Sequence, residues 1–595
     1  MNAALVAAAR SAGVILERPG EVARPVPEPT VRALVDALGR VPPVGEEAED
    51  EAVAAYVPPF LDEGRAFGIA LQLYQLRSED NFGVGDLADL RALIPTFAEA
   101  GADFVGLNPL HALFTAAPDR ASPFSPSDRR ALNPLMIAVA DVPGYRREMR
   151  DGVTVPGAHE EVDYPAAARA KLTVLRRIHD AWRAGDASVP EAERLAADRH
   201  ASSSPALEGV ALFEAVSHAM VGEGHGAGWS SWPAEYQDHD GAAVVAFRDA
   251  HRDDVAFHAW LQYVAATQLE ATQEAALAAG MRLGLYLDLA VGEAPDGAST
   301  WADPSLAMPG LRIGAPPDLF SLDGQDWGLA PLSPTALVER DFAPYRAVMS
   351  AVMAQAGAMR IDHAMGLERL WLIPDGVAPK DGAYVRQPRL TDQVVAATHR
   401  HRAVAIGEDL GVVPPGFRER MTARRLFSMR LLSFERGAHG ALVAPARYPR
   451  DALACLSTHD IAPLEAWWRG DEIDLRLELG RIDADVAHAE HSARSRERAE
   501  MLGLAGLPPS RARGMLDDDL VVALHRLGAR SASRLFAVRL EDVVGGRRLV
   551  NLPGTDREHP NWRRTLPMTV EEVARSERLH RVLSAVAAVR GRRTS

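Results

Sequence analysis

The stretch Met359-Arg360-Ile361-Asp362-His363 places three ionisable side chains directly after a mostly apolar and small run, residues 348–358. A strand that enters a protein core is expected to be apolar. Ionisable groups at its end are expensive to desolvate unless a partner or a substrate uses them. The stretch therefore predicts a buried strand that ends at the rim of an active site.

Two later stretches repeat this pattern. Residues 403–407 (AVAIG) lead into Glu408 and Asp409, and residues 453–458 (LACLST) lead into His459 and Asp460. A single acid at a strand end more often caps the next helix or forms a structural ion pair. Because the pattern occurs three times, the sequence favours catalysis over coincidence.

The spacing of these stretches is typical of a (β/α)₈ barrel, in which catalytic groups lie at the C-terminal ends of several strands. Eight runs have the composition of barrel strands. They are residues 68–73, 102–107 and 282–287, the strand ending at Asp362, and residues 403–407, 427–432, 453–458 and 535–540, the last ending at Glu541 and Asp542. The predicted fold class is α/β, a (β/α)₈ TIM barrel with large helical insertions and a short N-terminal appendage.

The predicted catalytic barrel spans residues 65–595, and two insertions interrupt it. Residues 112–280, between strands two and three, form a subdomain beside the active-site face, and a helical insertion at 465–530 precedes strand eight. We expect Phe124 and Trp229, apolar residues in polar loops, to lie in the cleft. Residues 1–64 predict an appendage of helical pieces, interrupted by prolines including Pro42 and Pro43 and by the acidic run 46–51.

The composition excludes several classes of function. With 65 basic and 81 acidic residues, the net charge of −16 disfavours nucleic acid as a partner and suits a neutral substrate. The single cysteine, Cys455, and the lack of a signal-peptide pattern predict a cytoplasmic protein. No run approaches the roughly 18 apolar residues of a membrane-spanning helix. The two lysines, Lys171 and Lys380, fit neither a P-loop nor a Schiff-base site.

A glycine motif near the first strand has a structural explanation. Gly83, Gly85 and Ala88 match the dinucleotide-binding pattern G-x-G-x-x-G/A, but that pattern directly follows its strand, and here about ten residues intervene. We expect these glycines to turn a loop, with Asp86 near the N-terminus of the next helix.

Two chemistries fit three acids on nearby strand ends. In retaining glycoside chemistry, one carboxylate attacks the anomeric carbon and a second, about 5–5.5 Å away, protonates the leaving oxygen. Alternatively, the acids and their neighbouring histidines could bind metal ions in a barrel hydrolase. Amidohydrolase-type barrels place H-x-H after the first strand, whereas here that strand ends in Tyr74-Gln75. The sequence therefore favours glycoside chemistry, with no metal and no cofactor.

Further motifs accompany the three acidic strand ends, residues 360–363 (RIDH), 406–411 (IGEDLG) and 457–460 (STHD). They are residues 72–74 (QLY), 82–87 (FGVGDL), 122–126 (SPFSP), 287–292 (LDLAVG), 314–318 (GAPPD), 324–328 (GQDWG) and 551–555 (NLPGT). In this order, from about residue 67 to residue 564, they resemble the 4-α-glucanotransferases. This is the amylomaltase or disproportionating-enzyme family, glycoside hydrolase family 77, of the α-amylase clan.

The resemblance implies a role for each motif residue. Asp362 would be the nucleophile, Glu408 the general acid/base and Asp460 the stabiliser of the transition state. The residues that it implies for substrate binding are Arg360, His363, His459, Tyr74, Phe124, Asp288, Trp327 and Asn551, with Trp327 in a loop that resembles the family's active-site lid. The family usually has tyrosine where Phe124 stands, so a hydroxyl contact to sugar would be missing.

Physical chemistry agrees with these roles. Arg360 projects from the same strand face as Asp362, so its charge is expected to keep Asp362 ionised. Glu408 must keep its proton near neutral pH, which requires apolar or anionic surroundings. The resemblance implies a retaining enzyme that transfers an α-1,4-glucan segment to the 4-hydroxyl of another glucan or of glucose. The alternatives are an α-glucan hydrolase with the same residues and a non-catalytic glucan-binding protein.

Overall fold

A computed structural model of the chain describes residues 1–18, 24–39, 41, 53–157, 159–317, 321, 323–437, 439–555 and 558–592. Pro42, Pro43 and the acidic run 46–51, which the sequence assigned to the appendage, lie outside these residues, as does Asp318 of the motif at 314–318.

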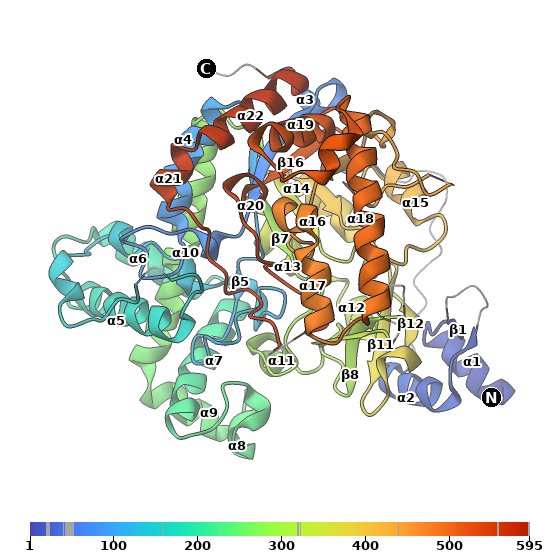
Figure 1. Cartoon of the computed structure of the whole chain (residues 1–595). Helices are drawn as coiled ribbons and strands as arrows, with labels where there is room; N and C mark the ends of the chain where they lie inside the picture. Colours follow the sequence, from blue (N-terminus) through green and yellow to red (C-terminus); the bar gives the residue numbers. More distant parts are fainter. Residues whose placement is uncertain are drawn as a thin grey trace.

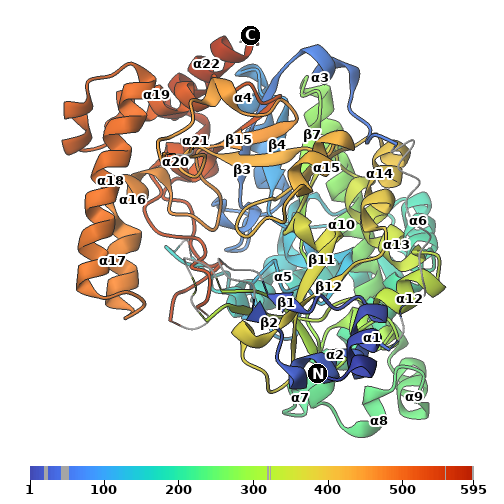
Figure 2. The same ribbon diagram turned by 90° about the vertical axis from the view of Figure 1, so that its right-hand side faces the viewer.

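Eight parallel strands form the barrel at the centre of the molecule (Figures 1 and 2). In spatial order they are β13 (Val404–Gly407), β10 (Ala358–Ile361), β7 (Gly284–Leu289), β4 (Phe104–Leu107), β3 (Ala66–Leu71), β16 (Leu535–Arg539), β15 (Ala452–Cys455) and β14 (Ser428–Leu431). A parallel bridge between Ile406 and Phe427 joins the two ends of this order. Each strand overlaps or directly follows one of the eight predicted runs, and the predicted (β/α)₈ barrel is confirmed.

One part of the strand prediction is wrong. Most of the run before Met359 belongs to a helix, α13 (Ala343–Met353), and β10 begins only at Ala358. The buried residues of α13 recur at helical spacing; they are Tyr345, Val348, Met349, Val352 and Met353. Periodicity within a short apolar run does not separate a buried helix from a buried strand, so the run was assigned to the strand that follows it.

The side chains that fill the barrel change from apolar to charged along the strands. Phe104, Tyr286 and Ala358 lie in the apolar cluster inside the barrel. Asp288 lies two residues after Tyr286 on β7, and Arg360 lies two residues after Ala358 on β10; the two are paired in register. Because side chains alternate along a strand, both point to the same side as the apolar residues before them. Because all eight strands run parallel, this pattern brings charged groups together at the C-terminal mouth of the barrel.

A four-stranded antiparallel sheet, which the sequence did not predict, is formed by segments that follow β7 and β10. Its order is β12 (Ala383–Arg386), β11 (Arg369–Pro374), β8 (Leu311–Ala315) and β9 (Gln325–Leu329). Trp327, predicted in a loop, lies on β9. The N-terminal helices α1 (Ala3–Ser11) and α2 (Glu28–Leu38) pack against this sheet in one hydrophobic cluster, as Figure 1 shows.

The segment between β4 and β7 is mostly helical, as predicted, and lies to the left of the barrel in Figure 1. Its helices are α5 (Tyr164–Arg183), α6 (Glu191–Ala201), α7 (Pro205–Gly222), α8 (Ala234–Gln237), α9 (Ala242–Ala250) and α10 (Arg252–Ala278). Trp229, which we expected in the cleft, instead packs against the hydrophobic core of this insertion and donates a hydrogen bond to Thr300 at 3.0 Å.

A buried lysine joins this insertion to the barrel. Lys171 of α5 is fully buried and donates to Asp86 at 3.2 Å and to the carbonyl of Leu135 at 2.7 Å. Asp86 caps the N-terminus of α4 (Leu87–Glu99), as predicted. This ion pair therefore fixes α5 against the first helix of the barrel.

The second insertion is also helical, as predicted. It contains α16 (Leu464–Arg469), α17 (Asp471–Glu478), α18 (Ala484–Ala505) and α19 (Asp518–Ala529), which lie on one side of the barrel (Figure 2). None of the helices in the described part of the chain has the length and apolarity needed to cross a membrane.

Candidate active site

The mouth of the barrel holds an arginine between two carboxylates. Arg360 Nη1 lies 2.8 Å from both oxygens of Asp288 and 3.0 Å from Oδ1 of Asp362. The backbone N–H of Asp362 donates to the Leu289 carbonyl at 3.0 Å, which continues the pairing of β10 with β7. The sheet therefore fixes the position of Asp362, and the buried Arg360 places a permanent positive charge beside its carboxylate.

Glu408 is held next to Asp362 by the backbone. Its Oε2 accepts the N–H of His363 at 3.0 Å, and its Oε1 accepts the N–H of Leu410 at 2.6 Å. Its own N–H donates to the Ile361 carbonyl at 3.0 Å. Since His363 directly follows Asp362, these bonds place the two carboxyl groups at adjacent strand ends.

The third acid follows β15. Asp460 Oδ2 lies 3.1 Å from Nε2 of His459, and its Oδ1 accepts a hydrogen bond from the side-chain amide of Asn551 at 2.8 Å. The Asp460 side chain is 41% exposed, against 19% for Asp362, so it borders open space at the barrel mouth. A ligand that enters from solvent can therefore reach this carboxylate.

The backbone beside Asp362 is strained. His363 has a φ of +47°, in the left-handed region that non-glycine residues seldom adopt. Its ring lies 5.1 Å from the ring of Trp327 on β9, and its buried Nε2 has no hydrogen-bond partner among the described residues. Such strain persists where the surrounding structure enforces it, and it concentrates at active sites.

Phe124 packs beside His459 and Arg360, backed by further aromatic residues. The ring of Phe124 lies 4.8 Å from that of His459 and 5.3 Å from that of Trp562, and the guanidinium of Arg360 lies 5.9 Å from its centre. Tyr74 is buried in the same hydrophobic cluster, where its hydroxyl has no hydrogen-bond partner among the described residues. Flat aromatic faces of this kind suit the apolar faces of sugar rings.

The environment separates the pKa values of the two central acids. Burial raises the pKa of Asp362 to about 6 although Arg360 opposes the rise. The expectation that Arg360 holds Asp362 ionised is thus right in direction, but burial outweighs the arginine; the pKa nevertheless stays below neutral pH. Burial raises the pKa of Glu408 further, to about 8, again against Arg360 and with the help of the Asp362 charge.

Asp460 shifts the other way. Burial acts to raise its pKa, but His459, the hydrogen bond from Asn551 and the charge of Arg360 together outweigh burial and hold the pKa below its usual range. Of the three acids that end β10, β13 and β15, Asp362 and Asp460 are therefore expected to be ionised at neutral pH and Glu408 to be protonated. Acids whose surroundings separate their pKa values in this way are typical of paired nucleophile and acid roles.

Comparison with known proteins identifies the family. A family model described as 4-alpha-glucanotransferase matches residues 71–569. The chain belongs to the 4-alpha-glucanotransferase family. It is 36% identical to the 4-alpha-glucanotransferase of Mycobacterium tuberculosis, covering 89% of this chain and 76% of that protein. It is 34% identical to that of Haemophilus influenzae, covering 88% and 79%.

Solved structures agree with this assignment. The amylomaltase from Corynebacterium glutamicum superposes with a TM-score of 0.82 at 25% identity, covering 98% of this chain and 99% of that chain. The amylomaltase from Streptococcus agalactiae in complex with acarbose has the same fold, with a TM-score of 0.72 at 18% identity, covering 89% and 99%. The resemblance drawn from the motifs is thus confirmed at the level of family and fold.

In this member of the family, the structure brings together the predicted residues through direct contacts. Asp288, Arg360, Asp362, His363 and Glu408 form one connected group, which Trp327 borders, and His459, Asp460, Asn551 and Phe124 form the facing group. Tyr74 lies behind Phe124, and its direct contact with sugar stays a prediction. Trp562 was missed, although an aromatic residue in the polar loop 551–565 was a signal available in the sequence.

The acids and histidines of the site were also considered as metal ligands. Among the residues that the structure describes, no group of three or more His, Cys, Asp and Glu side chains could hold a metal ion. His459 contacts Asp460, and Asp362 and Asp288 contact Arg360, so their oxygens already face protein cations or donors. The geometry favours the glycoside chemistry of the family.

The pKa values predict a bell-shaped dependence of kcat/KM on pH. A nucleophilic Asp362 has to be ionised, so with this role the rate is expected to rise with pH through about 6. A proton-donating Glu408 has to be protonated, so with this role the rate is expected to fall as pH rises through about 8. Initial rates of maltotriose consumption between pH 4.5 and 9.5, in a buffer series of about constant ionic strength, test this. A rate that rises without a fall up to pH 9.5 would assign the proton donor to another group.

Proposed function

We propose that this chain cleaves an α-1,4-glucan, holds the segment covalently on Asp362, and transfers it to the 4-hydroxyl of an acceptor glucan or glucose. The observation that carries this proposal is the pair of adjacent acids with separated pKa values, one ionised and one protonated at neutral pH. We place this reaction in the cytoplasm, as the composition predicts, with no requirement for a cofactor.

In the first half of the reaction, a carboxylate oxygen of Asp362 attacks the anomeric carbon as the bond from that carbon to the leaving glycosidic oxygen breaks. Glu408 gives its proton to this oxygen, so the shortened glucan leaves as an alcohol. Positive charge develops on the sugar ring, and the ionised Asp460 stabilises it. Arg360, fixed between Asp288 and Asp362, keeps the nucleophile oriented.

In the second half, the acceptor 4-hydroxyl attacks the same carbon. Glu408, now a carboxylate, removes the hydroxyl proton, and the bond to Asp362 breaks. The Glu408 side chain then holds a proton again, and the stereochemistry at the anomeric carbon is retained after two inversions. The hydrogen bonds from the N–H groups of His363 and Leu410 stabilise the carboxylate form that this step requires.

An α-glucan hydrolase would use the same acids, with water as acceptor. Water is present at roughly 55 M and competes with the acceptor hydroxyl. Transfer prevails only if the bound acceptor has a far higher effective concentration, and a well-oriented group can reach about 10⁵ M or more. Phe124, which packs on the buried Trp562, and Trp327 on the other side are aromatic side chains that can orient an acceptor and displace water. A non-catalytic glucan-binding role would not account for the separated pKa values of Asp362 and Glu408.

Incubation with maltotriose distinguishes transfer from hydrolysis. Transfer is expected to produce glucose together with maltotetraose and longer chains, while the total concentration of reducing ends stays nearly constant, because each bond broken is replaced by another. Chromatography of the products and a reducing-end assay on the same samples measure both quantities. Reducing ends that rise in step with maltotriose consumption, without longer products, would show that water is the acceptor.

A further inference from the structure

One buried arginine at the barrel mouth has no part in the chemistry described above. Arg539 is the last residue of β16 and is 3% exposed. Leu535 and Ala537 of the same strand lie in the apolar cluster inside the barrel, so the alternation of side chains directs Arg539 to the same side, one layer nearer the mouth. We propose that Arg539 is a positioning residue that holds residues 457–464, the segment carrying His459 and Asp460, for the reaction proposed above.

The contacts of Arg539 enclose the catalytic part of this segment. Its Nη1 donates to the carbonyl of Thr458 and, at 2.8 Å, to the carbonyl of Ile461. These two carbonyls flank His459 and Asp460 in the chain. One guanidinium group, rigid and always charged, therefore fixes the backbone on both sides of the third acid.

Asp542, three residues after Arg539, holds the two ends of the same segment. Its Oδ2 accepts the hydroxyl proton of Ser457 at 2.6 Å, and its Oδ1 accepts the backbone N–H of Leu464 at 2.7 Å. Asp542 thus sets where the segment begins and ends, while Arg539 sets the path of the turn between. Together they connect the ends of β15 and β16 to the position of Asp460.

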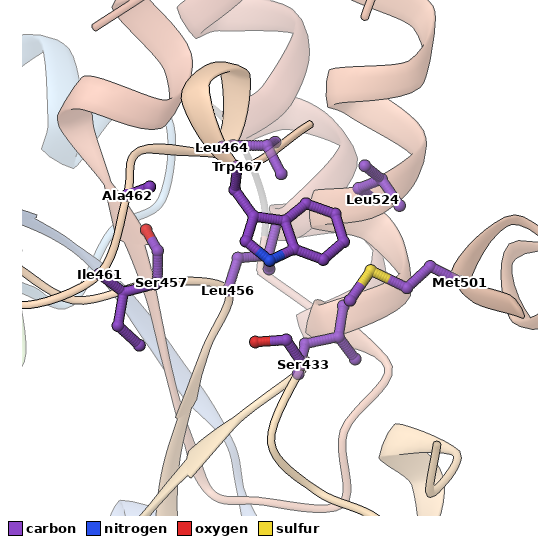
Figure 3. A pocket seen from close by; sticks show the side chains of 10 residues that line it. Ser433, Leu456, Ser457, Ile461, Ala462, Leu464, Trp467, Met501 and Leu524 are labelled. Carbon is purple, nitrogen blue, oxygen red and sulfur yellow. The ribbon is translucent and has the colours of Figure 1, made fainter. Parts of the chain in front are cut away.

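The same segment also borders a pocket with mostly apolar lining. Ile461, Ala462 and Leu464 line this pocket, with Met501 and Leu524 on the far side (Figure 3). Ala462 and Leu464 belong to the main hydrophobic core, and the ring of His459 packs against Phe124 and Trp562. Hydrogen bonds from the barrel strand therefore act together with this packing to position Asp460.

The charge of Arg539 is balanced within the same strand end. Its Nη2 lies 3.1 Å from Oε1 of Glu541, and both side chains are 3% exposed. Removing the arginine alone would leave Glu541 as a buried unpaired acid, which is expected to destabilise the fold. A test must therefore also include a variant in which both charges are removed.

The test compares four variants by the rate of maltotriose disappearance, which counts donor cleavage whether sugar or water is the acceptor. Arg539→Met is expected to lower kcat about 10²-fold, the effect of a misplacement of about 1 Å, with little change in KM. Arg539→Lys is expected to recover part of this loss, because lysine can still reach one carbonyl. Arg539→Met/Glu541→Gln is expected to melt at a higher temperature than Arg539→Met and to keep the loss in kcat.

Arg590→Met is the matched control. Arg590 is 4% exposed and also donates to the backbone, at the Ser533 carbonyl, but near the opposite, N-terminal end of β16. Its replacement is expected to lower the melting temperature without lowering kcat. The proposal is overturned if the double variant has wild-type kcat or if Arg590→Met loses as much kcat as Arg539→Met. Wild-type products from maltotriose report separately on whether the chain is a transferase.

Discussion

Asp362→Asn is expected to lower kcat for maltotriose by at least about 10³-fold, a loss of about 4 kcal/mol of transition-state stabilisation. The amide is neutral and a poor nucleophile, so the covalent intermediate cannot form. The change is nearly isosteric, and the contact of Arg360 with the Oδ1 position and the backbone hydrogen bond to Leu289 can both be kept. Steady-state kinetics with equal amounts of folded protein measure the effect.

The matched control for this variant is Asp103→Asn. Asp103 is fully buried and binds Arg282 at 2.6 Å and Arg592 at 3.0 Å, but it precedes β4 at the opposite end of the barrel. Its replacement is expected to reduce the free energy of unfolding while leaving kcat of the folded protein near wild type. If Asp362→Asn kept more than about a tenth of the wild-type rate, a loss under about 1.4 kcal/mol, Asp362 would not be the nucleophile.

Glu408→Gln is expected to lower kcat for maltotriose to a similar degree, because glutamine can neither donate a proton to the leaving oxygen nor remove one from the acceptor. The side chain can still accept the N–H of His363 or Leu410 through its amide oxygen, so the fold is expected to persist. A donor with a good leaving group, such as α-maltosyl fluoride, needs no protonation. The first step with this donor is therefore expected to remain fast.

Glu214→Gln serves as the comparison for this second variant. Glu214 lies on α7, is buried, and has a pKa that burial raises to about 7 against hydrogen bonds from Thr115. It resembles Glu408 in burial and pKa, but its hydrogen bonds among the described residues are with Thr115 and not with the three acids of the barrel mouth. Loss of the first step with α-maltosyl fluoride in Glu408→Gln, together with full activity in Glu214→Gln, would indicate a structural rather than a proton-transfer role for Glu408.

The barrel was predictable because each of its strands is a local apolar run, and several of the strands end in ionisable residues. The antiparallel sheet was not, since its strands are four to six residues long and its central pairing, β11 with β8, joins segments far apart in the chain. Leu372, for example, pairs with Ile313. Local composition does not specify such pairing. The end of α13 was wrongly assigned to a strand for a related reason: its buried face is as apolar as a buried strand, and local composition does not distinguish the two.

The acids of the site were predictable from their place at strand ends, but their electrostatic balance was not. The sequence indicated that Arg360 would favour the ionised form of Asp362; only the structure shows that burial outweighs it. Trp562 and Arg539 were missed for a different reason. Their importance comes from contacts with Phe124 and with the carbonyls of Thr458 and Ile461, which lie far from them in the sequence.

Mass spectrometry of the Glu408→Gln protein after brief incubation with α-maltosyl fluoride tests most directly whether Asp362 carries the glucan. Without a general base the second step is slow, so the glycosyl-enzyme is expected to accumulate. We expect an intact mass increased by one maltosyl group, and after proteolysis at low pH the added mass on the peptide containing Asp362. The Asp362→Asn/Glu408→Gln protein is expected to show no such increase. No adduct on Glu408→Gln, or an adduct on a peptide without Asp362, would contradict covalent transfer through this residue.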